Sequence, residues 1–423
     1  MKFALAIFAA LGAVAICFLF GLNWRSIQRG EAPSTAPLMK LVGLESPASK
    51  LAPQEVFKAN YARIQADYYK SVPAKELKYA AMSGLVASLG DPHTMFMPPA
   101  IATEFNQETK ANFVGIGARL DPDPAGAKIL IVFDDSPAFK AGIKAGDLIT
   151  SVDGKSTMGM PVDSIVKRIR GPEGTTVKIT LTRPGHPQPI SASVRRAQID
   201  IPTVEGRFVA DRQYGILSVT SFSEPTADQF NAELEKLEKH TLRGLVIDLR
   251  NNPGGLLNIA GEMLSRFVDG KRIILMKERG GRMEEVRAPS GQRHDFSYPV
   301  VVLVNEDSAS AAEIFTGVLR DYHLATTVGT HTYGKASVQN VFPLIDGSVI
   351  KITIARYLLP TGDDIGRKVD ADGTFISGGI EPDVKVAYDL DNVNVKYGDP
   401  KTDNQLLKAF SVLDGKRTPA AIR

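Results

Sequence analysis

The amino-acid sequence predicts a multidomain α+β protein with a helical N-terminal segment, a β-rich middle domain and a larger α/β domain. Apolar residues at helical spacing before residue 92 predict the helical segment. A glycine-rich stretch with short β-branched runs, residues 112–196, predicts the β-rich domain. Alternating apolar strands and amphipathic helices after residue 199 predict a mainly parallel sheet. The composition, with 43% hydrophobic and 23% charged residues, is ordinary for soluble domains.

The chain begins with an apolar stretch, Phe3 to Leu22. Its length, about 20 residues, is that of a membrane-spanning helix. No small-x-small cleavage site ends it, so residues 1–25 are expected to be an uncleaved signal anchor rather than a removed signal peptide. The single cysteine, Cys17, lies inside this stretch, so no intrachain disulfide can form. Residues 26–52 are rich in Ser, Pro, Gly and charges and are predicted to be a linker.

Residues 53–110 are expected to form the helical region. One helix carries apolar residues at helical spacing from Phe57 to Tyr68. A second helix ends where Gly90 and Pro92 break the pattern. His93 follows this break and is interpreted as a turn residue rather than a metal ligand, because no second metal-binding residue accompanies it.

Residues 111–198 form the predicted β-rich domain. Successive backbone N–H groups could face one carboxylate in the glycine-containing segment Phe113-Val114-Gly115-Ile116-Gly117. This segment and the stretch SPAFKAGIKAGDLI, residues 136–149, resemble the two signatures of a PDZ domain. The resemblance implies peptide binding along an open strand edge, beside a helix from Val162 to Arg170. The alternative is a glycine-rich β domain without peptide function.

Residues 199–390 form the predicted α/β core. A buried strand, Gly244 to Arg250, leads through Asn-Asn-Pro into Gly254 and Gly255 at the start of a helix. Two glycines at a helix start can present backbone N–H groups to a developing oxyanion. The alternative is a turn that needs glycine only for its backbone dihedrals.

A second strand-to-helix junction in this core carries a candidate nucleophile. The apolar run from Val300 is followed by a small polar turn and by a helix from Ala311, so Ser310 lies at the junction. Such a serine can expose its hydroxyl next to outward-facing N–H groups, as a nucleophile requires. Lys335 could be the base if burial lowers its pKa. Gln339, four residues later, could orient the amine without adding charge.

The sequences NEDSASAAEI and YGKASVQ resemble the carboxyl-terminal processing peptidases, also called tail-specific proteases, which are serine proteases with a PDZ domain. DLRNNPGG and GGIEPDV resemble two further signatures of this family. The resemblance implies a crotonase-like protease core with Ser310 as nucleophile, Lys335 as base and Gln339 as its support. It also implies an oxyanion hole made by the N–H of Ala311 and one of the two glycines, and no cofactor or metal. Asp307, Ala312 and Ala336 depart from the family's usual residues.

The predicted function is that of a membrane-anchored serine endopeptidase whose PDZ domain recognises a C-terminal or extended segment of protein or peptide substrates. Bacterial members of the family are exported. The resemblance therefore implies a single-pass inner-membrane protein whose catalytic part is in the periplasm. A net charge of +3 without a basic block argues against nucleic-acid binding. The sequence leaves open the oligomeric state, an activating partner and the effect of the PDZ domain at rest.

The sequence leaves several alternative functions and nucleophiles open. A Ser-His-Asp hydrolase could use His323 or His331 as base. The Gly-x-x-x-x-Gly-Lys pattern ending at Lys335 fits a phosphate loop, but Ala336 offers no hydroxyl to magnesium. A catalytically silent, membrane-tethered PDZ scaffold is a third class. Ser308 and Ser337 are alternative nucleophiles. Residues 391–423 are predicted to be a tail with a short helix between residues 403 and 413.

Overall fold

The computed structural model describes residues 52–415 of the 423-residue chain. The predicted signal anchor and nearly all of the predicted linker lie outside the described residues. Within residues 52–415, no helix is long and apolar enough to cross a membrane. The chain divides into two compact units, residues 1–84 and 85–423, and each is described by itself.

The described part of the first unit is helical, as predicted. It contains α3 (Pro53–Asp67) and most of α4 (Ala74–Ala87). Proline at the first position and Glu55 in the first turn of α3 both favour the start of a helix. No residue of α3 is buried, and Phe57 and Ile64 are each 55% exposed. The apolar residues that predicted this helix are therefore not core residues.

The second unit contains the PDZ-like β domain. Its main sheet has the strand order β3-β4-β5-β7-β8, with β6 paired to β5. The strands are β3 (Ala118–Asp123), β4 (Gly126–Val132), β5 (Leu148–Val152), β6 (Lys155–Ser156), β7 (Thr176–Thr182) and β8 (Ile190–Arg195). Helices α6 (Pro137–Lys140) and α7 (Val162–Ile169) accompany the sheet, and α7 buries Ile165 and Ile169 in the domain core. Strand β3 is an edge strand, which confirms the predicted open edge.

A separate two-stranded ladder leads into and out of this domain. It pairs β2 (Asn112–Gly115) with β9 (Ala197–Asp200) in antiparallel register. Phe113, Val114 and Gly115 therefore belong to a strand, and only Ile116 and Gly117 remain as the turn into β3. The expected carboxylate-binding segment is thus half strand and half turn.

The α/β core is built on a mainly parallel sheet with the order β10-β11-β12-β15-β16-β21. Only the first pair is antiparallel, which confirms the predicted parallel pairing. The strands are β10 (Val204–Val209), β11 (Tyr214–Val219), β12 (Gly244–Asp248), β15 (Val300–Val304), β16 (Ala325–Gly329) and β21 (Val384–Lys385). Every residue of β12 and β15 is buried, because helices cover both faces of the sheet.

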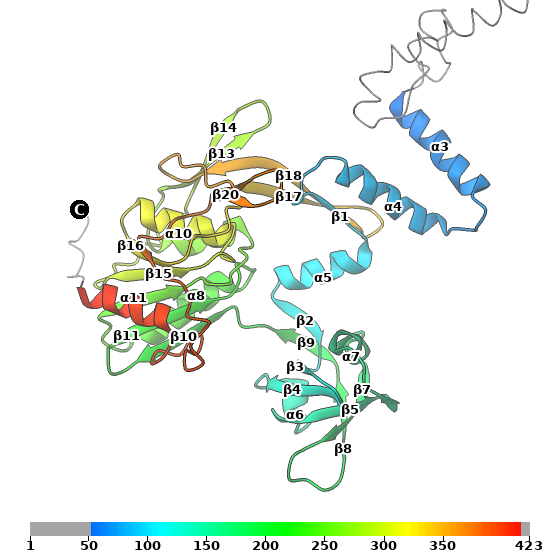
Figure 1. Ribbon diagram of the computed structural model, residues 1–423, viewed down its shortest axis with the longest axis horizontal. Coiled ribbons are helices and arrows are strands. Elements are labelled where there is room, and N and C mark those ends of the chain that lie inside the picture. The colour runs from blue at the N-terminus through cyan, green and yellow to red at the C-terminus, as the bar shows by residue number, and fades with distance from the viewer. Residues whose placement is uncertain (1–51, 416–423) are drawn as a thin grey trace, which may run out of the picture. The chain divides into compact units, whose positions relative to one another are not determined.

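The ribbon in Figure 1 shows helices packed against this sheet. Alternate residues of its strands pack on opposite faces. Leu245, Ile247 and Val302 face α8 (Thr226–Glu238), α9 (Leu257–Ser265) and α10 (Ala311–Asp321). Val246 and Leu303 face α11 (Asn404–Gly415), the helix predicted for the tail. The helix of the tail therefore supplies part of the core.

A second sheet lies beside the first and has the path β1-β18-β13-β14, with β17 also paired to β18. Its strands are β1 (Met95–Met97), β13 (Arg272–Glu278), β14 (Met283–Arg287), β17 (Ser337–Pro343) and β18 (Val349–Leu358). A small ladder pairs β19 (Lys368–Val369) with β20 (Phe375–Ser377). Between β1 and β2 lies α5 (Pro99–Thr109). The sequence did not predict β1, which pairs with β18 in antiparallel register.

Candidate active site

A cavity of about 580 Å³ brings together residues that are far apart in the sequence. Five residues singled out from the sequence line it: Ser310, Lys335, Gln339, Gly254 and Gly255. The rest of the wall includes Phe105 and Glu108 of α5, Phe222 after β11, and Val341 and Lys351 of the β17–β18 hairpin. The predicted catalytic residues therefore share one partly enclosed space.

Ser310 occupies a strained turn between β15 and α10. Its φ of 55° and ψ of −116° lie outside the regions favoured by residues with a side chain. Its hydroxyl makes no capping bond to the helix, and the residue is half-buried in the cavity wall. This is the strand-to-helix geometry of a nucleophile elbow, although the usual flanking glycines are absent.

Glu313 holds this turn and the lysine loop together. The Glu313 side chain is completely buried, and its carboxylate accepts the backbone N–H groups of Ser310 and Lys335 at 2.8 and 2.9 Å. The Gly334 N–H and the Thr332 hydroxyl donate to its other oxygen. Burial raises the pKa of Glu313, and the four hydrogen bonds oppose that shift. Because every partner is a donor, the arrangement fits the ionised carboxylate.

Glu313 was not among the site residues predicted from the sequence. It is the one charged residue in an otherwise apolar stretch of α10, and it follows Ser310 at the spacing of a capping box. Both signals were present in the sequence.

The two glycines differ in their backbone partners. The Gly254 N–H donates to the Asn252 side chain at 2.8 Å. Gly254 also lies against the nucleophile turn, because a Cβ placed there would be 2.8 Å from the Ala311 nitrogen. In the described residues, neither the Gly255 N–H nor the Ala311 N–H has an intramolecular acceptor. One free backbone donor thus belongs to the residue after Ser310, and the other belongs to a residue that lines the same cavity as Ser310.

Lys335 precedes β17 and is half-buried. Burial lowers the pKa of its amine, and the positive charge of Lys351 lowers it further. Glu313 and Asp91 oppose the shift through their negative charges. The Tyr357 hydroxyl donates to the Lys335 carbonyl at 2.7 Å and fixes the backbone. Asp307, which could have raised this pKa, does not contribute to the shift.

Gln339 lines the cavity, but its amide nitrogen donates to Ser337 Oγ at 2.8 Å and Thr353 Oγ1 at 3.1 Å. Over residues 52–415, no hydrogen bond joins Gln339 to Lys335. Ser308 is fully buried, and its hydroxyl donates to the Leu249 carbonyl. Its hydrogen bond therefore stabilises the turn before Ser310, and Ser308 does not line the cavity.

The segment after α4 also reaches this region, which the sequence did not indicate. Thr94 Oγ1 accepts the Thr353 N–H at 3.0 Å and donates to Asp91. His93 lies close enough to Lys335 that the charge of this lysine contributes to lowering the pKa of His93, after the larger effect of burial. His93 is therefore a turn residue, as predicted, but one beside the candidate base.

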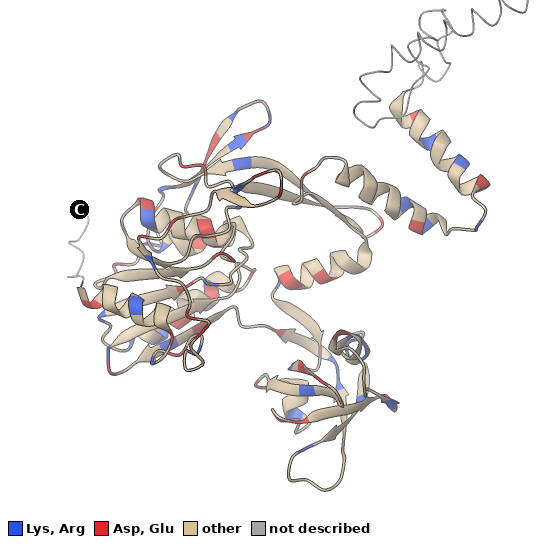
Figure 2. Cartoon of the chain, viewed as in Figure 1, with Lys and Arg blue, Asp and Glu red and all other residues tan. Residues whose placement is uncertain are grey.

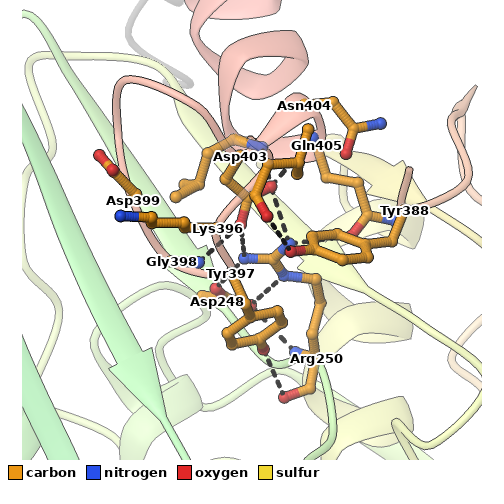
Figure 3. Close-up of polar contacts among 12 residues, drawn as sticks. Asp248, Arg250, Tyr388, Lys396, Tyr397, Gly398, Asp399, Asp403, Asn404 and Gln405 are labelled. Carbon is orange, nitrogen blue, oxygen red and sulfur yellow. Dashed lines mark hydrogen bonds and ion pairs between the residues drawn. The ribbon is translucent and has the colours of Figure 1, made fainter. Parts of the chain in front are cut away.

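The strand that leads to the two glycines ends in a buried ion-pair network (Figure 3). Arg250 is bonded to Asp248 at 2.7 Å and to Asp403 at 2.9 Å. Gln405 also accepts from Arg250, and the Tyr397 ring lies 4.4 Å from the guanidinium carbon. Asp403 immediately precedes α11 and Gln405 lies in its first turn, so these contacts join the C-terminal segment to the strand that precedes the glycine turn.

The expected peptide-binding segment of the PDZ-like domain has two further features. In the described part of the chain, the Ile116 and Gly117 N–H groups have no acceptor, whereas their carbonyls accept from Ala138 and Phe133. The Phe113 ring stacks under Arg170, with 5.4 Å between the ring centroid and the guanidinium carbon. Two adjacent free donors at the end of an open edge strand fit a carboxylate.

The candidate histidine bases lie elsewhere. His323 is exposed at the far end of α10 from Ser310, and His331 stacks on Phe375 at 4.7 Å. Neither lines the cavity. In the described part of the chain, no group of three or more His, Cys, Asp or Glu residues could hold a metal ion. Strand β17 directly after Lys335, where a phosphate loop needs a helix, also counts against nucleotide binding.

The structure thus contains both parts that the sequence resemblance implies, a PDZ-type β domain and an α/β core with a serine at a strained strand-to-helix turn. Comparison with known families agrees: the model of peptidase family S41 matches residues 213–386 and the PDZ domain model matches residues 132–183. The chain belongs to the carboxy-terminal processing proteases of peptidase family S41.

Two relatives illustrate the extent of the similarity. The carboxy-terminal processing protease CtpB of Bacillus subtilis is 33% identical, over 91% of this chain and 81% of its own. A CtpA-like serine protease of Staphylococcus haemolyticus is 37% identical over 79% of this chain, which spans 65% of that relative's length. The fold is shared with a solved S41 protease from Bacteroides fragilis, with a TM-score of 0.52, 17% identity, and coverage of 84% of this chain and 96% of that one.

Proposed function

We propose that this chain is a membrane-anchored serine endopeptidase that uses a Ser310–Lys335 dyad. The observation that carries the proposal is the shared cavity, in which an uncapped serine on a strained turn meets a lysine whose pKa is lowered by burial. A lysine that is partly neutral can accept a proton from a serine, which an ordinary surface lysine cannot do near neutral pH. Membership of family S41 supports the reaction class.

The reaction then runs in two halves. Neutral Lys335 accepts the Ser310 hydroxyl proton while Oγ attacks the scissile carbonyl. The resulting ammonium returns the proton to the leaving amine, which departs as the first product. Lys335 next removes a proton from water while the hydroxide attacks the acyl carbonyl, and the ammonium then returns the proton to Ser310 Oγ as the acid product leaves. Gln339 shapes the wall beside the amine through its bonds to Ser337 and Thr353.

The oxyanion of the tetrahedral intermediate is held by the N–H groups of Ala311 and Gly255. Ala311 is the first residue of α10, so its N–H has no partner in the helix and the helix dipole favours negative charge there. Between the two glycines, Gly255 is the better donor because the Gly254 N–H is already bonded to Asn252.

The PDZ domain selects the substrate by its C-terminal or extended segment. The free N–H groups of Ile116 and Gly117 bind the terminal carboxylate, and the substrate extends the sheet along β3. Protein or peptide substrates with accessible C-termini meet this requirement. Charges of both signs are interspersed on the structure (Figure 2), which fits peptide substrates better than nucleic acid.

The location belongs to the same proposal. The apolar stretch from Phe3 to Leu22 anchors the chain in the inner membrane, and the catalytic part works in the periplasm. Extraction at alkaline pH and protease accessibility in spheroplasts test this point. Release of the full-length chain from membranes by carbonate would contradict the anchor.

The dyad is tested by comparing wild type, Ser310→Ala and Lys335→Ala on an unfolded protein and on a peptide with a free apolar carboxyl end. We expect cleavage by wild type only. Loss of activity in Ser310→Ala alone would move the search for the base to the histidines. A chain that neither cleaves nor reacts with a serine-directed fluorophosphonate would be a PDZ scaffold instead.

A further inference from the structure

A second lysine, Lys351, lies in the wall of the same cavity on β18. In the β17–β18 ladder, Lys351 is opposite Val341, and Thr353 is opposite Gln339. Because side chains alternate across a strand, these four residues share one face of the hairpin. Gln339, Val341 and Lys351 all line the cavity. The Lys351 side chain therefore lies on the face of the hairpin that lines the cavity of Ser310 and Lys335.

The Lys351 amine has no hydrogen-bond or ion-pair partner among residues 52–415. It approaches the Phe105 ring, with 5.7 Å between Nζ and the ring centroid. The residue is half-buried, and burial lowers the pKa of its amine, while the negative charges of Asp91 and Glu108 oppose the shift. A half-buried cation without a bonded partner acts on its surroundings mainly through its charge.

Lys335 and Lys351 differ in the charged groups that surround them. Lys335 is near Lys351, Glu313, Asp91 and His93, and His93 also lies near enough to Lys351 to be affected by its charge. Glu313 already accepts four hydrogen bonds, so its charge is largely compensated. Lys351 has Asp91 and Glu108 as neighbouring acids, and Glu108 lines the cavity with it. Of the two amines, Lys351 is thus the one better supported as a cation.

We propose that Lys351 is a positioning residue for the proton transfer, whose positive charge in the shared cavity keeps the Lys335 amine neutral and able to accept the Ser310 proton. A neighbouring cation makes protonation of a desolvated lysine more costly, which is one of the known ways to activate such an amine. The inference rests on the proposed function, in which Lys335 is the base.

The test is the pH dependence of kcat/KM for the full chain on an unfolded protein substrate. In Lys351→Met, the acid limb of the profile is expected to move to higher pH, with about a tenfold loss at neutral pH for each unit of displacement. Lys351→Arg keeps the charge and is expected to keep the limb at its wild-type position. Lys277→Met removes an exposed lysine from the neighbouring strand β13 and controls for net charge.

An acid limb that does not move in Lys351→Met would overturn the inference. If KM rises as well, Lys351 would be a substrate-binding residue. Should the methionine variant unfold, Lys351→Gln with the pH dependence of fluorophosphonate labelling provides the same comparison. These results differ from those expected if the proposed function itself is wrong. In that case wild type would show no acid limb, or Lys335→Ala would stay active.

Discussion

Replacing Glu313 with glutamine tests the contact that joins the two catalytic loops. One carboxylate oxygen accepts from Ser310 and Lys335, and the other accepts from Thr332 and Gly334. A glutamine side chain has the same size but offers one oxygen and one NH₂ group. Two of the four groups that donate to Glu313 would therefore meet the NH₂ group, which cannot accept their hydrogen bonds. The Thr332 hydroxyl can rotate and accept a hydrogen bond from the NH₂ group. The glutamine side chain should therefore turn its NH₂ group toward Thr332 and Gly334 and its oxygen toward Ser310 and Lys335.

In that orientation a single backbone N–H, that of Gly334, loses its acceptor. An unpaired buried donor costs about 1–3 kcal/mol, and this is the expected loss of unfolding free energy in urea. Glu313→Ala removes the acceptor of all four donors, so its loss should be larger and fluorophosphonate labelling of Ser310 should fall with it. Glu235→Gln, at an exposed position of α8, is the control and should change stability by no more than about 0.5 kcal/mol. A Glu313→Gln protein that unfolds like this control would refute the role assigned to the carboxylate.

Three further results are expected. A Cβ in Gly254→Ala would lie 2.5 Å from the Ala309 carbonyl at a φ of +94°, so strain of about 1–3 kcal/mol should displace the Ser310 turn and lower kcat/KM about tenfold or more. Asp403→Asn breaks the buried pair with Arg250 and should cost about 3–5 kcal/mol in urea unfolding, whereas Asp414→Asn, at the half-exposed far end of α11, should cost about 1 kcal/mol. The pKa of Lys335 is lowered, and kcat/KM should fall as the pH drops through this pKa because the base becomes protonated. A profile that is flat to pH 5 with chemistry rate-limiting would contradict a lysine base.

The sequence predicted the elements that carry the chemistry because they depend on local patterns. The apolar run before Ser310 and the helix after it are β15 and α10. The shared cavity of Ser310 and Lys335 follows from parallel strands whose carboxyl ends meet at one edge of the sheet. The resemblance to a known family supplied the pairing of a serine with a lysine.

What the sequence did not predict depends on contacts between distant segments. Asp403 meets Arg250 only because α11 covers the second face of the sheet, and residue patterns near either one do not specify this. Lys351 reaches the cavity through the register of the β17–β18 ladder, which is set by pairing rather than by propensity. The preference for Gly255 over Gly254 rests on one hydrogen bond to Asn252, and adjacent glycines give no sequence signal that separates them.

The most direct test of the central claim is the rate and position of fluorophosphonate labelling in wild type and Lys335→Met, mapped by mass spectrometry. The probe needs an activated serine and an oxyanion site but no peptide recognition, so it isolates the dyad from the PDZ domain. We predict an adduct on Ser310 in wild type, with labelling at pH 8 at least about a hundredfold slower in Lys335→Met, since a positioned base contributes 10²–10⁴-fold. An adduct on another serine, or equal rates in the two proteins, would contradict the account.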